Sequence, residues 1–156
     1  MTDSRIVRTA LAEDFEQAMR LYSELAGDSQ IDLGPDGRQL WHDVLAHPGT
    51  SVYCVEQAGQ IAAVTTLHVL PNTTYKGRPY ALIENVVTLR RFHKQGAGRL
   101  LMEHVIDEAW QQDCYKIMLL TGQLAGARGF YERLGFSADE KYGMTLRRIP
   151  VRQKTR

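Results

Sequence analysis

Residues 83–102 read IENVVTLRRFHKQGAGRLLM, and this pattern predicts a buried strand that runs through a basic, glycine-containing turn into a helix. Gly96 and Gly98 leave the backbone open to close approach, so the first amides of the helix can donate to an anion, helped by the helix dipole. The same place holds four cationic side chains, Arg90, Arg91, Lys94 and Arg99. The stretch therefore predicts a turn that binds phosphate.

Two common nucleotide-binding motifs do not fit this turn. A P-loop needs Lys and then Ser or Thr after its last glycine, whereas Gly98 is followed by Arg99 and Leu100. A dinucleotide-binding fingerprint needs a third glycine near Leu101 and a place early in a βαβ unit, but this turn lies past the middle of the chain. Neither a nucleotide triphosphatase nor a Rossmann-type site is expected.

The turn resembles the acyl-CoA-binding signature of the GNAT superfamily of N-acetyltransferases, Arg/Gln-x-x-Gly-x-Gly/Ala after a strand. Its residues here are His93, Lys94, Gln95, Gly96, Ala97 and Gly98, and His93 differs from the usual first residue. A second stretch, ARGFYERLGF at residues 127–136, resembles the superfamily's A-x-x-F/L-Y-x-x-x-G-F element. Residues 83–87 and 114–117 are also similar to stretches of the glucosamine-6-phosphate N-acetyltransferases within that superfamily.

The resemblance implies a fold and a domain organisation. We expect a single GNAT domain over residues 1–156, with residues 150–156 as a flexible tail. The fold class is α/β (α+β), with a mixed, mostly antiparallel central sheet that contains a splayed parallel strand pair and is flanked by helices. By analogy with the family, we also expect a homodimer.

Hydrophobic patterns predict where the elements lie. The predicted strands are residues 6–9, 51–55, 61–70, 80–89, 115–120 and 141–148. The predicted helices are residues 15–25, 39–46, 97–109 and 124–134. Gly27 and Gly135 are expected to end two of the helices, residues 34–37 to form a turn, and residues 56–60 to close a β-hairpin.

The resemblance also implies which residues hold acetyl-CoA. If the strand around residues 83–89 parts from the strand at 115–120, the main-chain amides of Val86, Val87 and Thr88 can meet the pantetheine and the thioester. The basic turn would then hold the phosphates through His93, Lys94, Gln95, Gly96, Ala97, Gly98 and Arg99.

Two residues are candidates for catalysis. Glu84 is a carboxylate inside an apolar strand, where burial would prepare it to accept a proton from an ammonium substrate; the alternative is an edge residue that faces solvent. Tyr131 matches the superfamily's tyrosine that protonates the departing thiolate; the alternative is an amphipathic core tyrosine. Asn85 replaces the Asp that follows this Glu in the glucosamine-phosphate enzymes.

Composition excludes several other classes of function. A formal net charge of +1 gives no general basis for nucleic-acid binding, and no apolar run is long enough for a membrane span. The five histidines show no metal-ligand spacing, so no metal is expected. Cys54 and Cys114 are expected to be reduced and packed, with an acetyl-cysteine intermediate as a minor alternative. The polar N-terminus lacks a signal-peptide core, which favours a cytoplasmic protein.

These observations favour an acetyl-CoA-dependent N-acetyltransferase that acts directly on a primary amine of a small molecule, with an amino sugar phosphate as one candidate. Leu120 stands where the glucosamine-phosphate enzymes have an Asp that contacts the sugar, so another small amine, an amino acid or a protein N-terminus stays open. A non-catalytic acyl-CoA-binding or regulatory module is the alternative from another class. A protein acetyltransferase would need an acidic or extended groove near residues 28–38.

Overall fold

The computed structural model describes residues 5–123 and 126–150 of the 156 residues. These residues form two compact units, one that ends at Leu119 and one that begins at Leu120. In the described residues, no helix combines the length and the apolar character that crossing a membrane requires.

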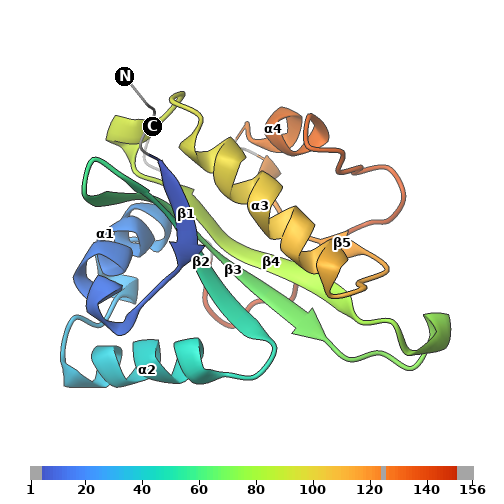
Figure 1. Cartoon of the computed structure of the whole chain (residues 1–156), viewed down its shortest axis with the longest axis horizontal. Coiled ribbons are helices and arrows are strands. Elements are labelled where there is room, and N and C mark those ends of the chain that lie inside the picture. The colour runs from blue at the N-terminus through green and yellow to red at the C-terminus, as the bar shows by residue number, and fades with distance from the viewer. Residues whose placement is uncertain (1–4, 124–125, 151–156) are drawn as a thin grey trace. The chain divides into compact units, whose positions relative to one another are not determined.

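The first unit is built on a sheet of five strands in the order β1-β2-β3-β4-β5 (Figure 1). The strands are β1 (Ile6–Thr9), β2 (Thr50–Gln57), β3 (Gln60–Leu70), β4 (Tyr80–Thr88) and β5 (Ile117–Met118). The first four pair antiparallel, whereas β4 and β5 are parallel and pair through Ala81↔Ile117 and Leu82↔Met118. The predicted fold class, a mostly antiparallel sheet with one parallel pair, is confirmed.

Helices cover both faces of this sheet. They are α1 (Phe15–Ala26), α2 (Pro35–Ala46) and α3 (Ala97–Gln111), with 3₁₀ turns η1 (Ala12–Asp14), η2 (Asp28–Gln30), η3 (Tyr75–Gly77) and η4 (Arg90–Phe92). Cys54 in β2 belongs to the apolar cluster that Phe15 and Trp41 supply from α1 and α2. Tyr53, which precedes Cys54 in β2, contacts His104 of α3, with 5.3 Å between the ring centroids. Since successive strand residues point to opposite faces, α3 lies across the sheet from α1 and α2.

β4 contains a bulge that the sequence pattern did not predict. Val64 of β3 pairs with Val87 and Thr66 pairs with Glu84, so Thr65 alone stands opposite two residues, Asn85 and Val86. Asn85 has a φ of 54°, in the left-handed region that Asn tolerates better than most residues. One extra residue on one strand defines a β-bulge, and it shifts the alternation of side chains along β4.

Three predicted boundaries in the first unit were wrong. Helix α2 begins at Pro35, because Gly34 takes the N-cap position and proline is favoured at the first helical position. The hairpin loop is only Ala58 and Gly59, with φ of 52° and 71°, which suits a two-residue turn that matches the twist of the strands. Strand β5 is also shorter than residues 115–120.

The second unit contains the helix α4 (Arg128–Glu132), which is shorter than the predicted 124–134; residues 124 and 125 lie outside the described residues. Gly135 follows it with a φ of 95°, as a residue that ends a helix should. The predicted strand 141–148 was wrong. Its alternation marks an apolar face, but a strand also needs a neighbour to bond, and no strand pairs with this segment in the described residues. The predicted flexible tail falls mainly on residues 151–156, outside the described part.

Candidate active site

The basic turn leads from the end of β4 through η4 into the N-terminus of α3. Lys94 and Gly96 both have positive φ, 59° and 88°, and Gly96 is the N-cap residue of α3. The first amides of a helix have no acceptor within the helix, and a glycine cap has no side chain to offer them. These amides and the dipole of a 15-residue helix therefore make a site suited to an anion. Of the predicted residues, 93–96 form the end of this turn and 97–99 begin α3.

Two predicted cofactor residues use their side chains to shape the turn. His93 Nε2 donates a 2.7 Å hydrogen bond to the carbonyl oxygen of Thr88, which ties the turn to the end of β4. Gln95 Nε2 donates to the carbonyl of Arg91 at 2.7 Å, and Gln95 Oε1 accepts from Gln57 Nε2 at 3.2 Å. What His93 and Gln95 offer a ligand is therefore mainly their backbone.

The guanidinium groups near the turn are not arranged as the sequence suggests. Arg99 forms a 2.7 Å ion pair with Glu103 one turn further along α3, and Arg91 lies over the ring of Phe92 at 5.1 Å. A residue that sequence reasoning missed, Arg5, donates to the carbonyl of Gln95, beside Gly96. Since 90 residues separate Arg5 from Gln95, no local pattern could have linked them.

The predicted acyl-binding positions lie at and after the bulge in β4. Val87 is buried with α1, whereas Val86 and Thr88 are half-buried. In the described residues, β5 pairs with β4 only at Ala81 and Leu82, so residues 83–88 have no strand partner on the side away from β3. Main-chain groups on that side are available to a ligand that runs along β4.

Glu84 is exposed, so the expected burial of its carboxylate was wrong, and the solvent-facing alternative describes it better. Glu84 pairs with Thr66 of β3, which in turn pairs with Val52 of the α1-side cluster. Directly paired residues share a face of the sheet, so the Glu84 side chain lies on the α1 side. The apolar residues around it in sequence do not cover it, because the bulge changes which positions point inward.

Tyr22 of α1 contacts Thr66, the strand partner of Glu84, and sequence reasoning did not predict this contact. Burial raises the pKa of Tyr22 to about 12, although a hydrogen bond with the side chain of Thr66 lowers it. Its ring meets Trp41 edge-on, with 6.4 Å between centroids. Tyr22 therefore stays protonated at neutral pH and places a polar group beside the Thr66–Glu84 pair.

Tyr131 lies in α4, in the second unit. Its half-buried ring makes edge-on contacts with Phe130 and Phe136, at centroid distances of 5.1 Å and 6.1 Å. Burial raises the pKa of Tyr131, which keeps the phenol protonated at neutral pH and able to donate a proton or a hydrogen bond.

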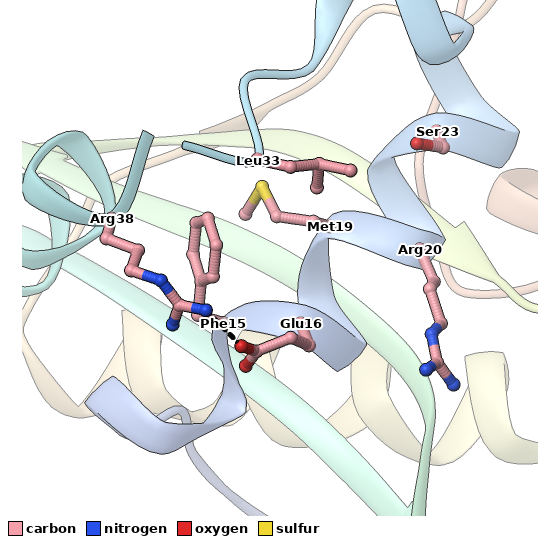
Figure 2. Close-up of a pocket in the computed structure, with 7 residues that line it drawn as sticks. All are labelled: Phe15, Glu16, Met19, Arg20, Ser23, Leu33 and Arg38. Atoms are coloured by element: carbon pink, nitrogen blue, oxygen red, sulfur yellow. Dashed lines mark hydrogen bonds and ion pairs between the residues drawn. The ribbon is translucent and has the colours of Figure 1, made fainter. Parts of the chain in front are cut away.

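A hollow of about 260 Å³ lies between α1, Leu33 and the first turn of α2 (Figure 2). Its lining is Phe15, Glu16, Met19, Arg20, Ser23, Leu33 and Arg38. Arg38 forms an ion pair with Glu16 and lies 4.6 Å above the ring of Phe15. Two guanidinium groups and one carboxylate thus line this hollow. The acidic or extended groove that a protein acceptor would need was expected near residues 28–38, where a second hollow of about 200 Å³ has Asp32 as its charged lining residue.

The two cysteines are poorly suited to nucleophilic catalysis. Both Cys54 and Cys114 are free and buried. Burial raises the pKa of Cys54 to about 11 and also raises that of Cys114, so little thiolate forms at neutral pH. Within residues 5–123 and 126–150, no group of three or more His, Cys, Asp or Glu side chains is placed to hold a metal ion.

Sequence comparisons link most of the chain to one protein family. Residues 7–136 match the sequence profile of the Acetyltransferase (GNAT) family. A curated relative, glucosamine 6-phosphate N-acetyltransferase of Trypanosoma brucei brucei, is 32% identical over 92 residues, which is 59% of this chain and 61% of the relative's length.

Solved structures extend the likeness to nearly the whole chain. A protein from Agrobacterium tumefaciens C58 that carries the name of an acetyltransferase, without a stated substrate, superposes with a TM-score of 0.85 at 36% identity, over 92% of this chain and 99% of that one. Glucosamine-6-phosphate N-acetyltransferase from Arabidopsis thaliana superposes with a TM-score of 0.82 over 94% of this chain and 99% of that one. At 18% identity, the second likeness concerns the fold alone.

Proposed function

Because the chain belongs to the acetyltransferase (GNAT) family, we propose that it transfers an acetyl group from acetyl-CoA directly to a primary amine of a small molecule. The observation that carries this proposal is the turn from Thr88 to Ala97. There a strand whose outer edge is open leads through η4 to a glycine-capped helix N-terminus. An anionic head group and an extended tail are the two parts of acetyl-CoA that such a site would accommodate.

We assign the phosphates of acetyl-CoA to the backbone of residues 93–99. The pantetheine arm would run along β4 and bond to main-chain groups of Val86, Val87 and Thr88, with the thioester near the bulge. Acetyl-CoA supplies the activated acetyl group when it is bound. The residues present suit it, because the helix amides need an acceptor and the open edge of β4 needs hydrogen-bonding partners.

Glu84 and Tyr131 are the proposed catalytic residues. Glu84 accepts a proton from the ammonium of the acceptor, directly or through a water, so that the nitrogen lone pair can attack the thioester carbonyl. As the carbon–sulfur bond breaks, Tyr131 gives its phenolic proton to the departing thiolate, and the second proton lost by the amine nitrogen restores the phenol through water. Transfer is direct, since neither buried thiol is activated to carry the acetyl group.

The acceptor that we favour is an amino sugar phosphate. Its support is the name of the curated relative, glucosamine 6-phosphate N-acetyltransferase, although that alignment covers only part of each chain. Leu120 counts against it, because leucine cannot bond to a sugar hydroxyl or amine. Polyamines, amino acids and aminoglycosides are the rival small-molecule acceptors.

A non-catalytic acyl-CoA-binding module is the second candidate, and it is favoured by the exposure of Glu84. The Tyr131→Phe variant separates the two: an enzyme loses turnover and keeps its CoA affinity, whereas a module has no turnover to lose. A protein acetyltransferase is less well supported, because the hollow that Gln30, Ile31 and Asp32 line has a single carboxylate, that of Asp32.

We also propose that the protein is a cytoplasmic homodimer. Three alternating apolar residues, Tyr142, Met144 and Leu146, are 99%, 92% and 103% exposed, and a second copy could remove them from water. Light scattering from 1 to about 100 µM should give twice the monomer mass, and Met144→Asp should reduce it. A monomer over the whole range would contradict the homodimer. Two unpaired cysteines fit a reducing compartment, which cell fractionation can check.

The decisive experiment measures thiol release from acetyl-CoA with a panel of amines that includes glucosamine 6-phosphate, polyamines, amino acids and aminoglycosides. Turnover with one class would identify both the activity and the acceptor. Glu84→Gln should lower kcat by roughly 100-fold with that acceptor if Glu84 is the base. Tight acetyl-CoA binding without turnover across the panel would favour the binding module or a protein acceptor instead.

A further inference from the structure

We propose that Arg5, the residue immediately before β1, binds the pyrophosphate of the acyl-CoA in the turn before α3. This inference rests on the proposed function, since it names a further binding residue for the same ligand. Arg5 belongs to none of the sequence motifs that define the turn, and it reaches the turn only because β1 lies next to α3 in the folded chain.

The first argument is the position of the Arg5 side chain. Its Nη1 donates to the carbonyl of Gln95, which anchors the guanidinium against the turn. A Cβ added to Gly96 would lie only 2.7 Å from Arg5 Nη1 and 3.7 Å from Cζ, so the guanidinium occupies the space that the glycine leaves. A guanidinium has five N–H donors in a planar fork, so bonding to a carbonyl and contacting a phosphate are compatible.

The second argument is where the guanidinium groups of Arg99, Arg91 and Arg5 lie relative to the turn. Arg99, the cation nearest to the helix amides in sequence, pairs with Glu103, and Arg91 stacks on Phe92. A doubly charged pyrophosphate at this helix terminus would gain most from a guanidinium that is already held in place. Arg5 is the guanidinium that contacts the glycine of the turn.

The third argument is that the anchor itself is rigid. Both ends of the Gln95 side-chain amide are hydrogen-bonded: Nε2 donates to the carbonyl of Arg91, and Oε1 accepts from Gln57 Nε2. Because the carbonyl that fixes Arg5 belongs to this braced residue, the guanidinium loses less conformational freedom when a ligand arrives. Arg5 thereby links β1, the end of β2 and the turn into one binding surface.

Calorimetric titration of the full-length protein with CoA, dephospho-CoA and pantetheine tests the proposal. Arg5→Gln should weaken the binding of CoA and of dephospho-CoA by about 10-fold to 100-fold, the range expected for a charge-assisted hydrogen bond. Pantetheine has no phosphate, so its affinity should stay within about 2-fold. The salt dependence of CoA binding should also become shallower in the variant, because one charge contact is lost.

Arg78→Gln is the matched control, with the same change of charge. Arg78 pairs with Asp113 at 3.3 Å, beyond the C-terminal end of α3, and a 15-residue helix is about 22 Å long. Its CoA affinity and salt dependence should equal those of the wild type. A structural role of Arg5 would lower the affinity without changing the salt dependence, because a displaced turn still meets the same number of charges.

Each other outcome overturns a specific statement. Equal CoA affinity of Arg5→Gln and wild type would overturn the role of Arg5 and leave the proposed function standing. A loss seen with CoA but not with dephospho-CoA would move the contact from the pyrophosphate to the 3′-phosphate. Wild-type protein that fails to bind CoA would overturn the proposed function itself.

Discussion

The hydroxyl of Thr65 donates a 3.0 Å hydrogen bond to the main-chain carbonyl of Glu84, across the bulge in β4. This bond satisfies an acceptor that the irregular pairing would otherwise leave without its regular partner. Thr65 is fully buried, so the bond forms in a dry environment where a missing partner is costly. The bulge is therefore held in place at the residue that we propose as the general base.

The bulge predicts that two substitutions of Asn85 differ in their effect on stability. Asn85→Gly should keep both the free energy of unfolding and the activity near wild type, because glycine adopts a φ of 54° without strain. Asn85→Val should lower the free energy of unfolding by roughly 1–2 kcal/mol, since a β-branched residue is strained in the left-handed region. Urea unfolding and kcat/KM measure the two effects. Equal values for both variants would mean that the backbone at Asn85 does not need this conformation.

The turn before α3 predicts a specific effect of Gly96→Ala. Alanine at position 96 would have to adopt a φ of 88°. Its Cβ would lie only 2.7 Å from Arg5 Nη1, so the guanidinium would have to move. CoA affinity should therefore fall at least 10-fold, as measured by calorimetry. Gly59→Ala is the control, because Gly59 has a similar φ of 71° but nothing within 4 Å of its added Cβ. It should lose some stability and no CoA affinity; a similar loss of affinity in both variants would contradict the prediction.

Local signals in the sequence were enough for most of the fold around the turn. The run of β-branched residues in β4, the basic glycine turn and the apolar spacing of α3 lie within 32 consecutive residues, and each predicts its element without help from the rest of the chain. The same signals placed residues 93–99 at one site. The bulge was not predicted, because a single Asn in an apolar strand is indistinguishable from an ordinary polar substitution.

Such local signals could not predict contacts between residues that lie far apart in the sequence. Arg5 meets Gln95, and Tyr22 meets Thr66, only after the sheet has formed. The exposure of Glu84 depends on the register between β3 and β4, which the alternation of one strand alone does not determine. Residues 141–148 show the converse case, in which an alternating pattern is present without a paired strand in the described residues.

The buried thiols predict that no acetyl-enzyme forms. Cys54→Ala and Cys114→Ala should each keep turnover within about 3-fold of wild type, because burial raises the pKa of both thiols and leaves them as packing residues. Mass spectrometry of the protein incubated with acetyl-CoA alone should show no added 42 Da. A stable acetyl adduct that one of the two substitutions abolishes would instead establish a covalent route.

The hydrogen bonds of the Asp14 carboxylate predict how the free energy of unfolding depends on pH in the acid range. Burial by itself raises the pKa of Asp14, but the hydrogen bonds from Arg8 at 2.7 and 3.0 Å and from the Leu11 amide outweigh it, so the pKa is lowered. A carboxyl with a lowered folded pKa stabilises the protein above its unfolded pKa, near 3.8, and loses that contribution as the pH falls through the folded value.

Asp14→Asn should therefore lower the free energy of unfolding by about 2–4 kcal/mol at pH 7, because it leaves the Arg8 guanidinium without its buried carboxylate. The difference from wild type should shrink below pH 3.8. Glu16→Gln is the control, since the Glu16–Arg38 pair is exposed and should matter far less. A difference that is the same at pH 7 and at low pH would show that ionisation of Asp14 is not its source.

The proposed role of Tyr131 as the acid predicts how kcat depends on pH in the alkaline range. Tyr131→Phe should lower kcat by roughly 100-fold, the typical contribution of a general acid, while the CoA affinity stays within about 2-fold. Because burial raises the pKa of Tyr131 above the usual value of 10, its ionisation should not reduce wild-type kcat until the pH passes 10. The sign follows from its role: an acid must keep its proton, so activity is lost on deprotonation. A decline in kcat that begins well below pH 10 in the wild type and disappears in Tyr131→Phe would contradict a buried, protonated Tyr131.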